Sequence, residues 1–241
     1  MHAWSEIQRR YEEWSYNEAE RATEAYYQNE IDSVREVYEV FTLEGRILDV
    51  GGHQGRLRYF LHHDRVSLYV VADPYVDVFS TIEASSDLLK AYPCLCEPVN
   101  FVPAHGEYLP FQAAVFDWVH MRSVLDHLAD PWLALKEAWR VLRPGGSVLV
   151  GITIGERIAT VPLRDRVRRK LTTEGLGGVG RALCRRLTGA SGHAEEHTWR
   201  VTEQGLEHLL EECGFMIGRT HWQKPPYEYV LYLQASKVIR A

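Results

Sequence analysis

Short apolar runs alternate with longer amphipathic stretches over most of the chain. Seven of the apolar runs have the length and residue types of strands. The expected strands are residues 47–50, 68–72, 101–103, 116–121, 147–153, 216–223 and 227–236. Because helical patterns separate the first five, the sequence predicts an α/β fold with a doubly wound, Rossmann-like sheet of seven mostly parallel strands. The last two runs are separated by only Lys224, Pro225 and Pro226, a connection that permits only an antiparallel hairpin.

Regions outside this alternation suggest how the chain is divided. Residues 1–44 carry apolar and aromatic side chains at helical spacing and should form helices beside the sheet, whereas residues 45–153 form the core. Residues 154–198 hold two basic helical patterns split by glycines, where a compact unit needs only a short loop. We interpret them as a helical cap insert over the substrate entrance, with a static pair of surface helices as the alternative. Residues 199–241 should complete the core with a helix and the hairpin.

Glycines cluster where the first expected strand ends. Residues 46–57 (RILDVGGHQGRL) pass through glycines at positions 51, 52 and 55 into a new helical pattern. Such turns expose unpaired backbone N–H groups, and glycine lets a ligand approach the backbone closely. About twenty residues further on, residues 70–73 (VVAD) end a second strand with Asp73, whose carboxylate can accept hydrogen bonds from ribose hydroxyls. The two features together predict a site for an adenosine-containing ligand.

Two further segments narrow the choice of ligand. Residues 104–111 (AHGEYLPF) precede the strand expected at 116–121, and residues 140–150 (RVLRPGGSVLV) follow it. In this order the chain resembles the class I S-adenosylmethionine-dependent methyltransferases of the small-molecule type, which carry a GxAExLPF-like segment and an RVLRPGG turn. The similarity covers residues 46–153 and continues more weakly through residues 203–215. It implies S-adenosylmethionine as the cofactor and methyl transfer as the activity.

The glycine loop and the resemblance together assign the cofactor contacts. The loop glycines should lie under the methionine and ribose portions, Asp49 should fix the loop or meet the amino group, and Asp73 should hold the ribose. The resemblance places residues 104–107 beside the adenine and residues 121–122 at the methionine end. The expected contacts are Asp49, Gly51, Gly52, Gly55, Asp73, His105, Gly106, Glu107, Met121 and Arg122.

Two histidines depart from the family pattern. His53 stands where the family usually has a glycine in the middle of the loop, and should narrow the pocket. His105 stands where the family usually has an aspartate that accepts from the adenine amino group. A neutral histidine can accept through one ring nitrogen, so recognition of adenine remains compatible with this sequence.

His127 is the candidate catalytic residue. A hydroxyl or phenol acceptor benefits from a general base with a pKa near neutrality, which suits histidine, whereas an amine needs none. His127 follows the strand at 116–121 and should lie at the carboxyl edge of the sheet, where open α/β folds bind ligands. A histidine that is hydrogen-bonded but not catalytic is the alternative. Asp126 and His120 are weaker candidates for the same role.

Composition limits the remaining possibilities. No apolar run of the 241 residues approaches the length of a membrane span, and the charged start lacks the apolar core of an export signal, so a cytoplasmic location is expected. The cysteines at positions 94, 96, 184 and 213 lack zinc-ligand spacing, and we expect free thiols. His193 and His197 have i, i+4 spacing but no evident third ligand, so we expect no metal site.

The net charge of −6 conceals an asymmetry. Residues 1–44 are rich in acids, whereas residues 155–190 are basic and either form a solvated surface or attract an anionic substrate or carrier. The basic segment lacks interleaved aromatic side chains for stacking on bases, and no Asn/Asp-Pro-Pro-Tyr segment follows residues 116–121. We therefore expect no nucleic-acid partner.

The sequence favours a methyltransferase that acts on an oxygen or nitrogen of a small molecule or a carrier-bound metabolite. One alternative is a non-catalytic protein that binds an adenosyl ligand and docks a partner through its basic helices. Another is a nicotinamide oxidoreductase that uses the same loop, although no catalytic Tyr-Lys pair is recognisable. The sequence does not identify the acceptor or the oligomeric state.

Overall fold

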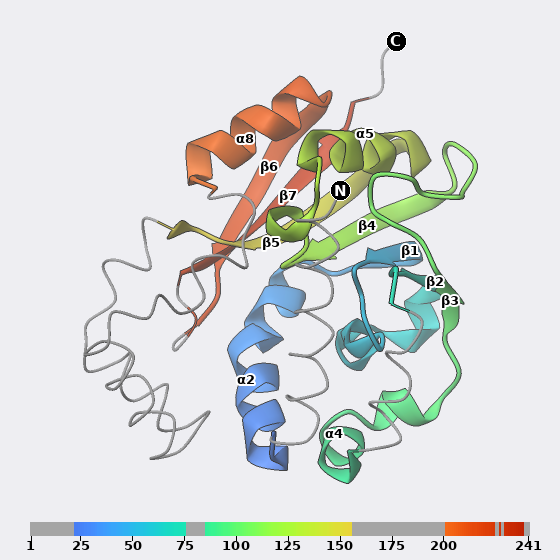
Figure 1. The fold of residues 1–241 in the computed structure, drawn as a ribbon, viewed down its shortest axis with the longest axis vertical. Coiled ribbons are helices and arrows are strands. Elements are labelled where there is room, and N and C mark those ends of the chain that lie inside the picture. The colour runs from blue at the N-terminus through green and yellow to red at the C-terminus, as the bar shows by residue number, and fades with distance from the viewer. Residues whose placement is uncertain (1–21, 76–84, 156–200, 225–226, 228, 239–241) are drawn as a thin grey trace.

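A mixed sheet forms the centre of the molecule, with strand order β3-β2-β1-β4-β5-β7-β6 (Figure 1). The computed structural model describes residues 22–75, 85–155, 201–224, 227 and 229–238. The strands are β1 Gly45–Val50, β2 Val66–Ala72, β3 Asn100–Val102, β4 Phe116–Arg122, β5 Leu142–Thr153, β6 Phe215–Trp222 and β7 Val230–Lys237. The first five pair in parallel, whereas β7 runs antiparallel to both β5 and β6. The predicted Rossmann-like sheet with its C-terminal hairpin is confirmed.

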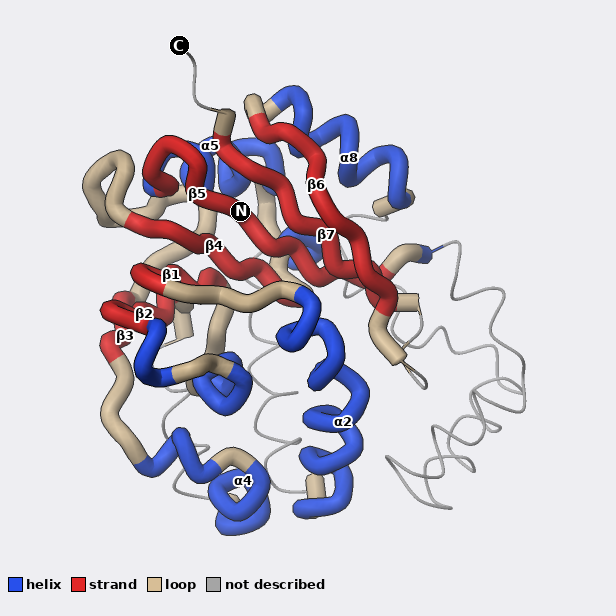
Figure 2. Tube along the Cα trace, turned by 180° about the vertical axis from the view of Figure 1, so that it is seen from behind, coloured by secondary structure: helices blue, strands red, loops and turns tan. Residues whose placement is uncertain are grey.

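Helices cover both faces of the sheet. The α-helices are α2 Glu24–Val40, α4 Ser86–Ala91, α5 Pro131–Val141 and α8 Glu203–Glu212, and the 3-10 helices are η1 Arg56–Phe60, η2 His63–Arg65, η3 Pro93–Cys96 and η4 Leu125–His127. Figures 1 and 2 show α5 and α8 on one side of the sheet and α2 on the other. Two apolar cores match this arrangement: α5 and α8 contribute to the first, and α2 to the second.

Helix α2 follows directly from its sequence. The side chain of Thr23 accepts a hydrogen bond from the backbone N–H of Tyr26 and so caps the helix. Buried positions then recur every three or four residues, which gives α2 one apolar face. The N-terminal part of this face packs with α4 and η3 rather than on the sheet. The helical prediction for residues 1–44 is confirmed for this helix, while residues 1–21 lie outside the described part.

Two local details differ from the prediction. The glycine loop leads into the short 3-10 helices η1 and η2 rather than into an α-helix. Strand β5 begins at Leu142, earlier than expected, because Leu142 already pairs with Phe116 before the register shifts to Trp118 and Ser147. The glycines of the RVLRPGG turn therefore lie inside an irregular strand. Residues 156–200 are outside the described part, so the cap remains a prediction.

Candidate functional site

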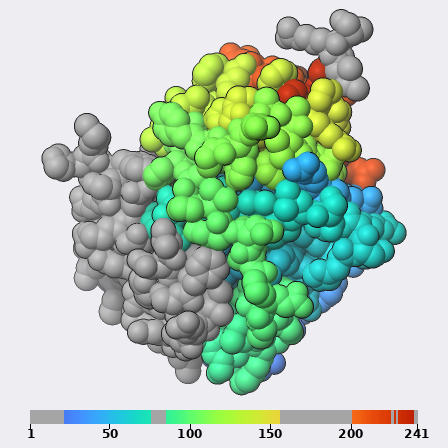
Figure 3. All heavy atoms as spheres, turned by 90° about the vertical axis from the view of Figure 1, so that its right-hand side faces the viewer, coloured from blue at the N-terminus to red at the C-terminus, as the bar shows by residue number. Residues whose placement is uncertain are grey.

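A pocket lies at the carboxyl ends of β1, β2 and β4. It is lined by Val50, Gly51, Ala72, Asp73, Pro74, Tyr75, Ala104, His105, Gly106, Ser123, Val124, His127 and Leu128. Segments far apart in the sequence therefore converge at the sheet edge where open α/β folds bind ligands. In Figure 3 the green segment around residues 100–125 lies directly against the cyan segment that includes β2.

Gly51 of the glycine loop lines this pocket, and the loop needs its glycines for steric reasons. Gly51 and Gly55 adopt positive φ angles of 66° and 80°, a region that glycine enters without penalty. A Cβ at position 51 would overlap the side chain of Val124, and one at position 52 would lie 2.5 Å from Oδ2 of Asp49. The Gly51 N–H donates to the carbonyl of Ala72 at 2.8 Å, which fixes the loop to the end of β2.

His53 occupies a left-handed backbone position in this loop. Its φ is 50°, a value that residues with a side chain rarely adopt. Glycine adopts it without strain, which explains why a glycine is usual at this position. Burial and the nearby positive charge of Arg56 lower the pKa of His53 to about 4, so the ring is neutral near pH 7. Its backbone N–H donates to Oδ2 of Asp73 at 3.0 Å. The loop is therefore tied to the predicted ribose-binding carboxylate.

Asp73 lies in the pocket wall with only 3% of its surface exposed. Its second oxygen, Oδ1, accepts from the backbone N–H of Tyr75 at 3.0 Å. Burial raises the pKa of Asp73 to about 6, although the N–H groups of Tyr75 and His53 oppose this rise. Each carboxylate oxygen has a further lone pair, so Asp73 can still accept hydrogen bonds from a ligand.

Asp49 lies beneath the glycine loop and is not among the residues that line the pocket. Its Oδ2 accepts from the hydroxyl of Tyr69 at 2.5 Å, and its Oδ1 lies 2.7 Å from Nδ1 of His120. Of the two roles expected for Asp49, this arrangement suits the fixing of the loop. His120 is buried, lies outside the pocket lining and therefore cannot act there as a base.

The segment 104–111 forms the opposite wall. His105 and Gly106 line the pocket, whereas the carboxylate of Glu107 points to the backbone that follows His127. Its Oε1 accepts from the N–H groups of Ala129 and Asp130 at 2.9 and 3.3 Å. No sequence motif predicts this contact, which holds residues 104–107 and the backbone after His127 together.

Helix α5 also holds this wall in place. Glu137 accepts from the N–H of Leu109 at 3.0 Å. Arg140 donates to the carbonyls of Leu109 and Phe111 at 2.9 and 2.7 Å, and forms an ion pair with Glu137. The Arg of the RVLRPGG turn therefore fixes the LPF end of the GxAExLPF-like segment, which links the two motifs physically.

His127 is presented to the pocket by an unusual turn. The chain leaves β4 through Ser123, which has a φ of 52° and donates its N–H to the carbonyl of Gly151 at 2.7 Å. Helix η4 then carries His127 into the pocket wall, where its Nε2 lies 3.9 Å from Oδ1 of Asp126. The predicted base therefore lies in the pocket, and its catalytic role stays a prediction.

The remaining expected cofactor residues lie behind the pocket lining. Met121 is completely buried in the core. Gly55 is the N-cap residue of η1. Arg122 points toward α2 and forms an ion pair with Glu30 at 3.1 Å. Direct contact of these three residues with a cofactor stays a prediction.

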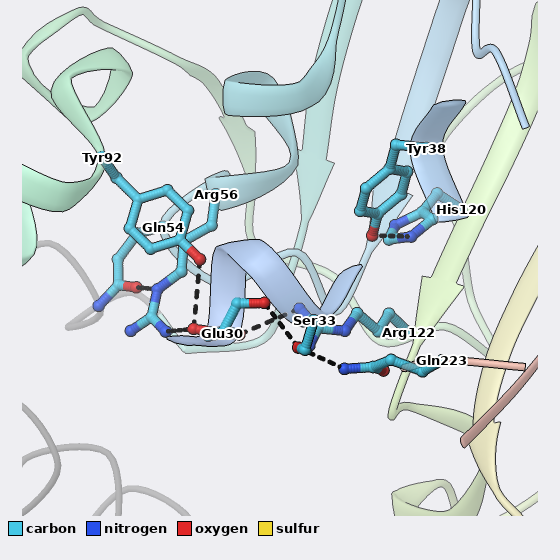
Figure 4. Close-up of polar contacts among 9 residues, drawn as sticks. All are labelled: Glu30, Ser33, Tyr38, Gln54, Arg56, Tyr92, His120, Arg122 and Gln223. Atoms are coloured by element: carbon cyan, nitrogen blue, oxygen red, sulfur yellow. Dashed lines mark hydrogen bonds and ion pairs between the residues drawn. The ribbon is translucent and has the colours of Figure 1, made fainter. Parts of the chain in front are cut away.

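Glu30 of α2 links the N-terminal helix to the pocket elements, as Figure 4 shows. Its carboxylate accepts from Arg122 at 3.1 Å and from both Arg56 and Tyr92 at 3.2 Å. Burial alone would raise the pKa of Glu30, but the positive charges of Arg56 and Arg122 outweigh it and hold the pKa below the usual value. The Arg56 guanidinium also lies over the rings of Tyr27 and Tyr92. Tyr27, an aromatic of the N-terminal segment, is thus part of a packed wall.

The metal and cysteine predictions concern only partly described regions. Within the described ranges no group of three or more histidine, cysteine or acidic side chains could hold a metal ion. Cys94, Cys96 and Cys213 are free thiols. Cys184, His193 and His197 lie outside the described residues. Among the helices that the structure describes, none has the length and apolar character required to cross a membrane.

Comparison with known proteins identifies the domain. Residues 48–150 match the family model of the methyltransferase domain. The ubiquinone/menaquinone biosynthesis C-methyltransferase UbiE of Rhizobium rhizogenes is 26% identical over 177 residues, which cover 70% of this chain and 64% of that protein. UbiE of Agrobacterium fabrum is 32% identical over 122 residues, which cover 51% of this chain and 45% of that protein. The chain thus matches less than two thirds of the length of these curated relatives.

A solved structure supports the same assignment at the level of the fold. The S-adenosylmethionine-dependent methyltransferase of Thermotoga maritima superposes with a TM-score of 0.57 at 17% sequence identity, over 98% of each chain. The sequence match over residues 48–150, the shared sheet topology and the position of the pocket agree with one another. Residues 48–150 thus match the methyltransferase domain, and the described fold is similar to that of a solved S-adenosylmethionine-dependent methyltransferase.

Proposed function

We propose that this protein transfers a methyl group from S-adenosylmethionine to an oxygen or nitrogen of a small molecule or a carrier-bound metabolite. The observation that carries the proposal is the joint presence of Asp73, Gly51 and His127 in one pocket at the carboxyl edge of the sheet. A buried carboxylate suits a ribose, a glycine in the pocket lining suits close approach of a ligand, and an imidazole suits proton transfer.

The described residues fit the cofactor that the family implies. The oxygens of Asp73 keep lone pairs for the ribose hydroxyls, and the absence of a Cβ at Gly51 leaves the loop backbone open. His105 can accept from the adenine amino group through an unprotonated ring nitrogen. When bound, S-adenosylmethionine supplies a methyl group that is already activated on a positively charged sulfur.

His127 provides the proton chemistry in this proposal. Its imidazole takes the proton of an acceptor hydroxyl or phenol as the oxygen attacks, and the carboxylate of Asp126 stabilises the imidazolium that forms. An amine acceptor that is already neutral requires no such step. The acceptor must lie in line with the transferred methyl group, so the orientation set by the pocket wall contributes much of the rate.

The region outside the described core is proposed to select the acceptor. Residues 154–198 follow β5, after every segment that lines the pocket, and their basic side chains favour an anionic small molecule or a carrier-bound one. We retain a cytoplasmic location and the absence of a nucleic-acid partner as expectations.

A carbon acceptor is the second candidate, because the two curated relatives carry the name C-methyltransferase. An adenosyl-binding protein without catalysis is the remaining alternative. Isothermal titration calorimetry with S-adenosylhomocysteine first tests cofactor binding, and native protein that does not bind it would refute the proposal. A screen with methyl-labelled S-adenosylmethionine against phenols, carboxylic acids, amines and quinone precursors then identifies the acceptor atom. Binding without transfer to any acceptor class would favour the non-catalytic alternative.

A further inference from the structure

Four buried polar side chains form a continuous chain beneath the glycine loop. Asp49 of β1 and His120 of β4 are neighbours across the parallel strands, with Oδ1 of Asp49 2.7 Å from Nδ1 of His120. On one side, Tyr69 of β2 donates to Oδ2 of Asp49 at 2.5 Å. On the other, the hydroxyl of Tyr38 lies 3.1 Å from Nε2 of His120 (Figure 4). Each of the four residues is less than a tenth exposed.

The geometry fixes the protons that face Asp49 in this chain. An ionised carboxylate only accepts hydrogen bonds, so both oxygens of Asp49 require donors. Tyr69 supplies one, and Nδ1–H of His120 supplies the other. Burial raises the pKa of Tyr38 well above its ordinary value, so this hydroxyl keeps its proton and can donate to Nε2. The contact with Asp49 therefore requires a ring proton on Nδ1 of His120, whereas the Tyr38 hydroxyl can either donate to Nε2 or accept from it.

The position of the Asp49 carboxylate controls the position of the loop. A Cβ at Gly52 would lie 2.5 Å from both Cγ and Oδ2 of Asp49, so the loop backbone passes directly over this carboxylate. The next residue, His53, donates its N–H to Asp73. The loop is thus held from beneath by Asp49 and from the side by Asp73. A displaced Asp49 carboxylate would move Gly52 relative to the ribose-binding carboxylate.

We propose that His120 is a positioning residue for cofactor binding, which acts by holding the Asp49 carboxylate under Gly52 through its Nδ1–H. His120 touches neither the pocket nor the reacting atoms, so its effect reaches the cofactor only through Asp49 and the loop. The inference rests on the proposed function, because the bound cofactor senses the position of the loop.

Two substitutions of His120 separate its two nitrogens. The amide nitrogen of asparagine can occupy the place of Nδ1, whereas that of glutamine reaches the place of Nε2. His120→Asn should keep the dissociation constant for S-adenosylhomocysteine within about threefold of native, because the donor to Asp49 remains. His120→Gln should raise it by about tenfold, the lower end of what loss of a hydrogen bond to a charged group costs. The same variant should raise KM for S-adenosylmethionine more than it changes kcat.

Tyr38→Phe is the matched control. It removes the hydroxyl from the outer end of the chain and leaves the bond between His120 and Asp49 in place, so cofactor affinity should stay within about twofold. Equal losses of affinity in His120→Asn, His120→Gln and Tyr38→Phe would indicate general packing damage and overturn the proposal. Unchanged affinity in His120→Gln would also overturn it.

Nitrogen-15 NMR of the native protein tests the proton position without any variant. The expected spectrum at pH 8 shows His120 with a protonated Nδ1. A spectrum with the only proton on Nε2 would overturn the inference, even where His120→Gln failed to fold. Native protein that shows the expected spectrum but binds no S-adenosylhomocysteine would instead refute the proposed function, so the two failures are distinguishable.

Discussion

Cofactor binding should release a proton from Asp73 in weakly acidic solution. The pKa of Asp73 in the cofactor-free protein is about 6, because burial disfavours the charged carboxylate more than its two backbone N–H partners favour it. Ribose hydroxyls donate hydrogen bonds and therefore bind the ionised form. At pH 6 about half of the molecules must lose a proton to bind, and at pH 8 almost none must. Affinity should accordingly fall by about tenfold between pH 7 and pH 5.

The assay is isothermal titration calorimetry with S-adenosylhomocysteine in two buffers of different ionisation enthalpy. The difference between the two apparent binding enthalpies gives the number of protons released, expected to be about 0.5 at pH 6. Asp73→Asn serves as the control, because its amide retains one acceptor oxygen but cannot titrate. Equal proton release by native protein and Asp73→Asn at pH 6 would refute the assignment of Asp73 as the ribose-binding group.

The same carboxylate should make the cofactor-free protein less stable as the pH rises. A raised pKa means that the folded state binds the proton more tightly than the unfolded state, in which the pKa is near 3.8. Stability is therefore lost between about pH 4 and pH 6, by up to about 3 kcal/mol. Comparing urea unfolding of native protein and Asp73→Asn across this range isolates the contribution of Asp73. Parallel pH profiles of the two proteins would contradict the pKa argument.

Three further substitutions test other parts of the site. His127→Ala should lower kcat by about 10² to 10⁴ for a hydroxyl acceptor while leaving affinity for S-adenosylhomocysteine nearly unchanged, and near-native kcat would exclude the base role. The His53→Gly variant should have a free energy of unfolding about 1 kcal/mol greater than that of the His53→Ala variant, because only glycine accepts a φ of 50° without strain. Equal free energies of unfolding for the two variants would argue against that strain. Glu30→Gln should lower the free energy of unfolding by about 3 kcal/mol, since Arg56 and Arg122 lose a shared carboxylate in a largely buried site. Urea unfolding at pH 7 measures this loss, and an unchanged free energy of unfolding would show that these ion pairs are weak.

The seven strands could be predicted because each strand has a local pattern, whereas their order in the sheet comes from the tertiary structure. Apolar runs marked six strands to within three residues at each end and missed only the early start of β5, and the short connection at 224–226 required the hairpin. The glycine loop and Asp73 were also visible locally, since both depend on residue type at a fixed distance along the chain. The 3-10 helices after the loop were not, because the helical pattern of residues 56–65 does not distinguish a 3-10 helix from an α-helix.

The directions in which the site side chains point could not be predicted from the sequence. Glu107 lies in the segment expected beside the adenine, yet its carboxylate is directed to the backbone at Ala129 and Asp130. In the sequence, His120 and His127 are both histidines close to the end of β4. Strand alternation and pairing direct His120 into the core against Asp49, whereas the turn at Ser123 delivers His127 to the pocket. A difference of seven residues therefore separates a side chain that shapes the loop from one that can meet a substrate, and only the tertiary contacts distinguish them.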